Sequence, residues 1–192
     1  MTSRDSFLAR FKDTAISGHA LPSLEFAKIE APLKELFSEL LIKVGGQLGT
    51  SNKKQALQNF VDLQIEDGYQ VLSLVNGIKG NRNPLEITSP HQLSDIDYTI
   101  TPSSIAVAEN GSVWIDEEQL ITRNSVFICQ HLIAVTSVNN IVGTLNEAIK
   151  KINKIAGNWG CFVSGPSKTA DIEQALVIGA HGPMTMTVWL IE

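Results

Sequence analysis

The alternation of helical and strand-like segments is the feature that most constrains the fold of this chain. Apolar residues recur at helical spacing over residues 3–16, 32–44, 53–65 and 141–155, and a further short helix is expected over 172–177. Short runs rich in strand-forming residues lie at 69–74, 98–100, 104–108, 112–115, 125–128, 131–135, 161–163 and 185–191. Such alternation is typical of a mostly parallel sheet covered by helices. The sequence therefore predicts an α/β fold.

The Asn110-Gly111 dipeptide indicates a turn between two of these strands. Asn-Gly suits the two-residue turns of β-hairpins, so segments 104–108 and 112–115 are expected to pair in antiparallel fashion. One hairpin within an otherwise parallel sheet makes the expected sheet mixed. The first helix is followed by an aperiodic, proline-containing segment over 20–29. We therefore expect an N-terminal helical arm over residues 1–18 and a single domain over residues 19–192.

Composition and charge argue against several classes of function. The chain has 192 residues and a net charge of -5, and 43% of its residues are hydrophobic, as in a single globular domain. This charge gives no broad basic surface, so nucleic acid is not expected as a partner. No apolar run reaches the roughly 18 residues of a membrane span, and the N-terminal segment lacks the apolar core of a signal peptide. We expect a cytoplasmic protein without a membrane span.

The two cysteines, Cys129 and Cys161, limit the redox and metal chemistry of the chain. An iron–sulfur cluster takes about four cysteine ligands. Cys129 and His131 form only a two-residue C-x-H pair, which is too few ligands for a zinc site. We therefore expect both thiols to be small buried groups within strands, with no metal site and no cofactor bound by this chain.

A run of turn formers, hydroxyls, a lysine and two carboxylates occupies residues 164–173 and leads into the expected helix at 172–177. Its candidate ligand-binding residues are Gly165, Ser167, Lys168, Thr169, Asp171 and Glu173. Asp171 and Glu173 fit the capping of that helix, and the same loop fits a site for an anion or a polar ligand. It is not a P-loop, because Pro166 stands where the lysine must be.

Two further polar turns complete the candidate site. His181 lies between glycines and a proline at 179–183, where it can serve as a general base or hold the loop through a backbone hydrogen bond. Glu109 follows three apolar residues at the corner of the expected hairpin, and Gly111 and Ser112 complete that corner. The candidate catalytic residues are His181 and Glu109. We expect the three loops to converge in one pocket at the rim of the sheet.

These loops carry a resemblance to a known family. The runs Gly-Pro-Ser-Lys-Thr-Ala-Asp-Ile-Glu at 165–173 and Gly-Ala-His-Gly-Pro at 179–183 resemble the C-terminal signature of the lactate utilization protein C family, the LUD domain. Residues 3–10, 106–113 and 131–135 resemble the family's N-terminal helix, its Ala-Glu-Thr-Gly-Thr turn and its histidine-led strand. Asn110 and Ser112 stand where threonines are usual, and Lys168 replaces the commoner arginine.

The resemblance implies a fold of the NagB/RpiA/CoA-transferase type, a three-layer α/β/α domain, over residues 19–192. It also implies a role in oxidising L-lactate to pyruvate together with two partner proteins that carry the iron–sulfur centres. Two alternatives stay open from the residues. One is a stand-alone enzyme or binding protein for a small phosphorylated or CoA-linked metabolite, and the other is a binding module that docks through its helical arm. The sequence leaves open whether the chain catalyses a step and whether it forms a homo-oligomer.

Overall fold

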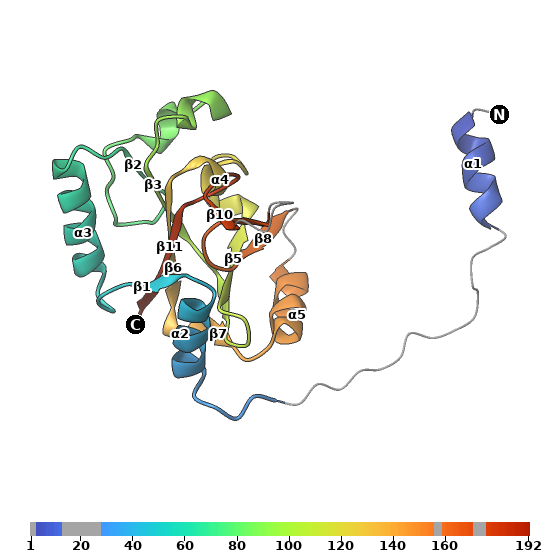
Figure 1. Cartoon of the computed structure of the whole chain (residues 1–192), viewed down its shortest axis with the longest axis horizontal. Helices are drawn as coiled ribbons and strands as arrows, with labels where there is room; N and C mark the ends of the chain where they lie inside the picture. Colours follow the sequence, from blue (N-terminus) through green and yellow to red (C-terminus); the bar gives the residue numbers. More distant parts are fainter. Residues whose placement is uncertain (1–2, 13–27, 156–158, 171–175) are drawn as a thin grey trace.

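A five-stranded, all-parallel sheet forms the centre of the molecule (Figure 1). The computed structural model describes residues 3–12, 28–155, 159–170 and 176–192. The central strands are β1 (Gln47–Leu48), β2 (Val71–Ser73), β3 (Tyr98–Pro102), β6 (His131–Ser137) and β11 (Thr185–Ile191), in the order β1-β11-β6-β3-β2. Every pairing in this sheet is parallel. The predicted α/β class with a mostly parallel sheet is confirmed.

A second sheet contains the expected hairpin. Its strands are β4 (Ile105–Val107), β5 (Ser112–Asp116), β7 (Ile141–Val142) and β8 (Gly160–Val163), in the order β7-β4-β5-β8. β4 and β5 pair in antiparallel fashion, as predicted, but Val107 pairs with Ser112, so the connection holds four residues rather than two. A separate antiparallel pair is formed by β9 (Lys168–Ala170) and β10 (Leu176–Ile178).

The helices follow the apolar periodicity of the sequence. They are α1 (Ser3–Lys12), α2 (Leu33–Lys43), α3 (Lys54–Glu66), α4 (Ser125–Ile128) and α5 (Leu145–Ile155), and short 3-10 turns cover Pro84–Glu86, Pro90–Leu93, Glu117–Gln119 and Val138–Asn140. The helices expected over 32–44 and 53–65 are confirmed. The helix expected over 3–16 is confirmed over 3–12, and its later positions lie outside the described residues. The helix expected over 141–155 begins later, because residues 141–142 form β7.

The core is built in layers. Leu57 and Val61 of α3 are fully buried against one face of the central sheet, and burial of such a side chain stabilises the fold by about 2 kcal/mol. The opposite face packs against the second sheet, for example Leu132 and Met186 against Val113. Helix α5 covers the outer face of that second sheet. Figure 1 shows this order of layers, from α3 through the two sheets to α5.

Two expected elements are wrong. Segment 125–128 is the helix α4 rather than a strand, because the Ser125 hydroxyl donates to the Thr122 carbonyl and the Asn124 carbonyl accepts from two later backbone N–H groups. Such local hydrogen bonds override strand propensity. The helix expected over 172–177 is described only from residue 176 onward, and residues 176–177 belong to strand β10 instead. Cys161 lies in a strand as expected, but Cys129 follows α4 instead.

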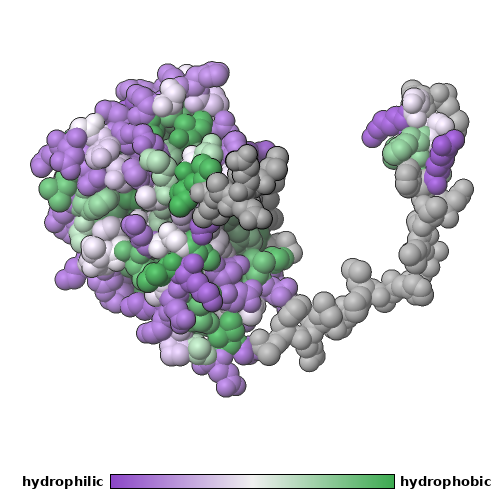
Figure 2. Space-filling model, in the orientation of Figure 1, coloured by the Kyte–Doolittle hydropathy of each residue, from purple (hydrophilic) through white to green (hydrophobic). Residues whose placement is uncertain are grey.

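On the face seen in Figure 2, hydrophilic side chains alternate with several apolar patches. One set of exposed apolar side chains comes from α4, from β10 and from the segment between β10 and β11: Phe127, Ile128, Val177, Ile178 and Met184. Within the described ranges, every helix is too short or too polar to cross a lipid bilayer. The predicted boundary between a helical arm and the domain, at residues 18 and 19, falls outside the described residues.

Candidate functional site

Two of the three predicted loops meet at the carboxyl end of α2. The Lys168 ammonium donates a hydrogen bond to the carbonyl of Val44, which directly follows α2. A Cβ atom at Gly165 would lie 2.4 Å from that same carbonyl oxygen, and one at Gly111 would lie 2.5 Å from the backbone nitrogen of Leu41. Both glycines also have positive φ, at 71° and 63°. Only glycine allows so close an approach in this conformation.

The third loop joins the same assembly through backbone hydrogen bonds. The Ser167 N–H donates to the carbonyl of Pro183 at 2.9 Å, and the Gly179 N–H donates to the carbonyl of Ser167 at 3.0 Å. The Ser164 hydroxyl donates to the carbonyl of Asn110 at 3.0 Å. Segments 110–112, 164–168 and 179–183 therefore lie together, and we call them the loop cluster.

Most of the polar side chains near the loop cluster have partners within the protein. The Ser112 hydroxyl, which is buried, donates to the side-chain oxygen of Asn110 at 2.7 Å. Glu109 turns away from the loop cluster, and its carboxylate accepts from the backbone N–H of Leu145, the first residue of α5. This contact places a negative charge at a helix N-terminus, where it is stabilising. These residues hold the architecture together.

Four predicted site residues remain, and the structure describes two of them. His181 is exposed and makes no hydrogen bond with the described residues. Thr169 lies in β9, where it pairs with Val177 of β10. Asp171 and Glu173 lie outside the described residues. A ligand-binding or catalytic role for the loop cluster therefore stays a prediction.

A cavity of about 280 Å³ lies between α3 and the central sheet. We call it the aromatic pocket, and its lining residues are Gln47, Leu48, Gly49, Thr50, Phe60, Tyr98, His131, Thr185, Thr187 and Trp189. The lining comes from β1 and the residues after it, from α3, and from three neighbouring strands. It contains no aspartate, glutamate, lysine or arginine, and its titratable side chains are His131 and Tyr98. The aromatic pocket is also close in sequence to the loop cluster, because Thr185 follows the 179–183 turn.

Strand register places three polar residues in one row across the aromatic pocket. Tyr98, His131 and Thr185 are the first residues of β3, β6 and β11, and they pair directly across the parallel sheet. Side chains at paired positions point to the same face. His131 Nδ1 lies 2.8 Å from Thr185 Oγ1, and the imidazole stacks on the Tyr98 ring with centroids 4.5 Å apart. The orientation of the imidazole is thus fixed from two sides.

Burial keeps the titratable groups of the aromatic pocket neutral. Burial lowers the pKa of His131, and the nearby Asp97 carboxylate opposes this shift. Burial also raises the pKa of Tyr98, with smaller contributions from Tyr69, Asp97 and Asp67. At neutral pH the imidazole and the phenol are therefore both uncharged. An uncharged imidazole can accept a hydrogen bond from a neutral ligand or donate one to it.

Sequence reasoning missed the aromatic pocket as a site. It considered His131 only in a C-x-H pair with Cys129 and at the start of a strand, and it did not join this residue to Tyr98, Thr185 or Trp189. These four residues come from three strands that are far apart in the sequence. The available signal was a polar or aromatic residue at the start of each strand, and strand order was needed to bring these residues together.

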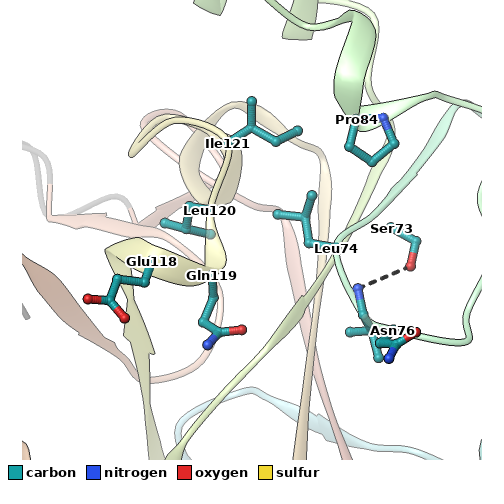
Figure 3. Close-up of a pocket in the computed structure, with 9 residues that line it drawn as sticks. Ser73, Leu74, Asn76, Pro84, Glu118, Gln119, Leu120 and Ile121 are labelled. Carbon is teal, nitrogen blue, oxygen red and sulfur yellow. Dashed lines mark hydrogen bonds between the residues drawn. The ribbon is translucent and has the colours of Figure 1, made fainter. Parts of the chain in front are cut away.

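A second cavity of about 400 Å³ lies where β2 ends, opposite the turn that follows β5 (Figure 3). Figure 3 shows Leu74 between Pro84 and the pair Leu120 and Ile121, while the polar ends of Glu118 and Gln119 point away from Leu74. This cavity is more open to solvent than the aromatic pocket, and its lining mixes apolar and polar residues. Its position at the carboxyl end of a strand suits a ligand, but few polar groups converge there.

A metal centre finds no support in the described ranges. There, no three histidine, cysteine, aspartate or glutamate side chains lie close enough together to hold a metal ion.

Comparison with known proteins assigns the family. The LUD domain model matches residues 50–191. The chain therefore belongs to the LUD domain family, and the membership predicted from its two signature runs is confirmed.

Curated relatives carry the name lactate utilization protein C. The relative from Shouchella clausii is 34% identical over 101 residues, which make up 50% of this chain and 44% of the relative. The relative from Macrococcus caseolyticus is 26% identical over 167 residues, or 83% of this chain and 68% of the relative. The chain thus spans less than half the length of the first of these relatives.

A solved structure shares the fold. It is the crystal structure of a DUF162 family protein from Deinococcus radiodurans, with a TM-score of 0.63 and 16% sequence identity. The match covers 83% of this chain and 96% of the solved chain. At this identity the likeness shows the shared fold alone.

Proposed function

We propose that this protein takes part in the oxidation of L-lactate to pyruvate, as a subunit without a redox cluster of its own. The observation that carries the proposal is the LUD domain match over residues 50–191. Relatives named lactate utilization protein C support the choice of substrate. The oxidation removes two electrons and two protons from lactate, so it needs an electron acceptor. We assign that task to two partner proteins that carry iron–sulfur centres.

The cysteines of this chain support the division of labour. The chain has two cysteines, while an iron–sulfur cluster takes about four thiolate ligands. Burial raises the pKa of Cys129 to about 11 and that of Cys161 to about 11. Both side chains are therefore thiols rather than thiolates at neutral pH. A protein of this kind can contribute to substrate handling or assembly while the partners carry the electrons.

The alternative ligand class, a phosphorylated or CoA-linked metabolite, has less support. It depends on Lys168 as a cationic donor, and the Lys168 ammonium already bonds the Val44 carbonyl at the end of α2. A phosphate would have to displace this helix-capping contact. Helix C-termini favour nearby cations, so the contact between the Lys168 ammonium and the Val44 carbonyl stabilises the end of α2.

Growth on L-lactate tests the proposal. Deletion of the gene should abolish growth on L-lactate, and the full-length chain supplied in trans should restore it. Growth on pyruvate should be unchanged, because pyruvate is the product of the proposed step. Normal growth of the deletion strain on L-lactate, with the partner genes intact, would contradict the proposal.

Co-purification tests the partner assignment separately. The full chain, isolated from cells grown on L-lactate, should bring down proteins with the visible absorbance of iron–sulfur clusters. The chain purified alone should lack that absorbance. Recovery of the chain without iron-containing proteins, from cells that need it for growth on L-lactate, would remove the partners while leaving the pathway assignment intact.

A further inference from the structure

We infer that the aromatic pocket is a binding site for a small, neutral nitrogen-containing aromatic ring. The inference goes beyond the proposed function and does not rest on it. Its basis is the shape of the cavity between α3 and the central sheet, the rings that wall it, and the His131 ring nitrogen that has no partner among the described residues.

The walls of the pocket favour a flat ring. Phe60 has ring contacts with Tyr98 and Trp189 at centroid distances of 6.1 and 6.0 Å, and Tyr98 stacks on His131. Gly49 lies against the Trp189 indole so closely that a Cβ atom there would come within 2.4 Å of it. The rings are thus held in place by one another and by the backbone. Aromatic walls bind planar aromatic ligands by stacking and edge contacts. A volume of about 280 Å³ suits a ligand of one or two rings.

Unused hydrogen-bonding groups call for heteroatoms on that ring. Nδ1 of His131 is held by Thr185, while its Nε2 makes no hydrogen bond with the described residues. The hydroxyl groups of Thr187 and Tyr98 add further polar groups to the lining.

Charge selects a neutral ring. The lining contains no aspartate, glutamate, lysine or arginine, and the Asp97 carboxylate near His131 already accepts hydrogen bonds from the Gln70 N–H and the Gln130 side-chain amide. Burying an unpaired charge is far less favourable than burying a hydrogen-bonded neutral group. The lowered pKa of His131 agrees with a preference for a neutral ligand, because the imidazole does not supply a positive charge at neutral pH.

Three probes with one ring and different charges test the inference. They are nicotinamide, which is neutral, nicotinate, which is anionic, and 1-methylnicotinamide, whose methylated ring nitrogen makes it cationic. Binding to the full chain is followed by saturation-transfer NMR and by the proton signals of the His131 imidazole. Nicotinamide should bind in the millimolar range or tighter and shift the His131 signals, and each charged probe should bind roughly tenfold more weakly.

Variants locate the binding. His131→Phe keeps a ring of similar size but removes both nitrogens, and it should weaken nicotinamide roughly tenfold, the loss expected for one buried hydrogen bond. The matched control His91→Phe, at an exposed histidine in the 3-10 turn Pro90–Leu93, should leave binding unchanged. Thr187→Phe fills the cavity from a half-exposed position and should abolish binding. It keeps the test decisive if His131→Phe does not fold.

Three results would overturn the inference. The first is the absence of nicotinamide binding to the wild-type chain, and the second is binding that Thr187→Phe leaves unchanged. The third is a preference for either charged probe, because that would show that a charge outside the lining controls the site.

Discussion

The loop cluster and the aromatic pocket differ in how their polar groups are used. In the loop cluster, Lys168 bonds the end of α2 and Ser112 bonds Asn110, while neighbouring Glu109 bonds the start of α5. In the aromatic pocket, one ring nitrogen of His131 has no hydrogen-bond partner among the described residues. The loop cluster therefore uses most of its polar side chains to hold the domain together, while the aromatic pocket leaves a ring nitrogen of His131 available to a ligand.

This difference shows that a signature run can be distinctive because the architecture depends on it. Gly111 and Gly165 allow two loops to approach α2 within distances that no Cβ atom permits. Lys168 then closes the same junction with a hydrogen bond. A chemical role of the loop cluster depends on groups that these contacts leave free, above all His181. The predictions below test whether the two regions divide their tasks in this way.

The largest effect is expected from Gly165→Ala. This change adds strain at a φ of 71° and places a Cβ atom 2.4 Å from the Val44 carbonyl oxygen. Together, strain and overlap should lower the free energy of unfolding by about 3 kcal/mol. Urea unfolding, followed by circular dichroism, measures the loss.

The matched control for Gly165→Ala is Gly77→Ala. Gly77 also has positive φ, at 82°, but an added Cβ atom would meet nothing within 4 Å. Strain alone should lower the free energy of unfolding by about 1 kcal/mol. Equal losses in the two variants would show that the junction with α2 is loose, and the comparison of the two regions would then fail.

A smaller effect is expected from Lys168→Met. Methionine keeps an unbranched apolar side chain but removes the charge that bonds the Val44 carbonyl. The loss should be about 0.5 kcal/mol at low ionic strength and should shrink as salt is added, because salt screens an exposed charge at a helix end. Lys150→Met, at an exposed position within α5, is the control, and it should change stability less. A loss in Lys168→Met that salt does not alter would show that the ammonium is not the stabilising group.

Much of the fold could be predicted because its elements have local causes. Periodic apolar residues predict α2 and α3, and Asn110-Gly111 predicts the β4–β5 hairpin. Errors arose where neighbouring segments decide the outcome. Residues 125–128 have strand propensity but form a helix under the influence of Thr122 and Asn124. Residues 176–177 form a strand because β9 offers them a pairing partner.

The candidate sites show the same limit. The loops 110–112, 164–168 and 179–183 could be joined from the sequence, because turns after strands tend to gather at one rim of a sheet. The use of their side chains could not be foreseen, since Lys168 and Glu109 bond helix ends that are distant in the sequence. The aromatic pocket needs the order β11-β6-β3, which follows from the folded sheet alone.

The pH dependence of stability tests the neutral character of the aromatic pocket. Burial lowers the pKa of His131 in the folded state, so the unfolded chain binds the proton more readily. This residue therefore contributes stability above the ordinary histidine pKa of about 6.5, and the contribution is lost as pH falls through that value toward the lower folded pKa. The groups that face it are Thr185, Tyr98, Tyr69 and Asp97.

NMR titration of the His131 imidazole checks this pH dependence directly, and its midpoint should lie below 6.5. In His131→Phe, the loss of stability between neutral and mildly acidic pH should be smaller than in the wild-type chain. A midpoint above 6.5 would mean that the site favours the charged imidazole over the neutral one, and the preference for a neutral ring would lose its support.

The smallest effect on stability is expected from His181→Ala. The His181 side chain is exposed and makes no hydrogen bond with the described residues, so its removal should change the free energy of unfolding by less than about 0.5 kcal/mol. Nicotinamide binding should also be unchanged, since His181 does not line the aromatic pocket. Urea unfolding and the NMR titration provide both measurements. Growth of the His181→Ala strain on L-lactate then tests whether the loop cluster has a chemical role. Growth at the wild-type rate fits a purely structural role. A growth defect in a fully stable variant would assign His181 a direct chemical role, and the proposed difference between the two regions would then fail.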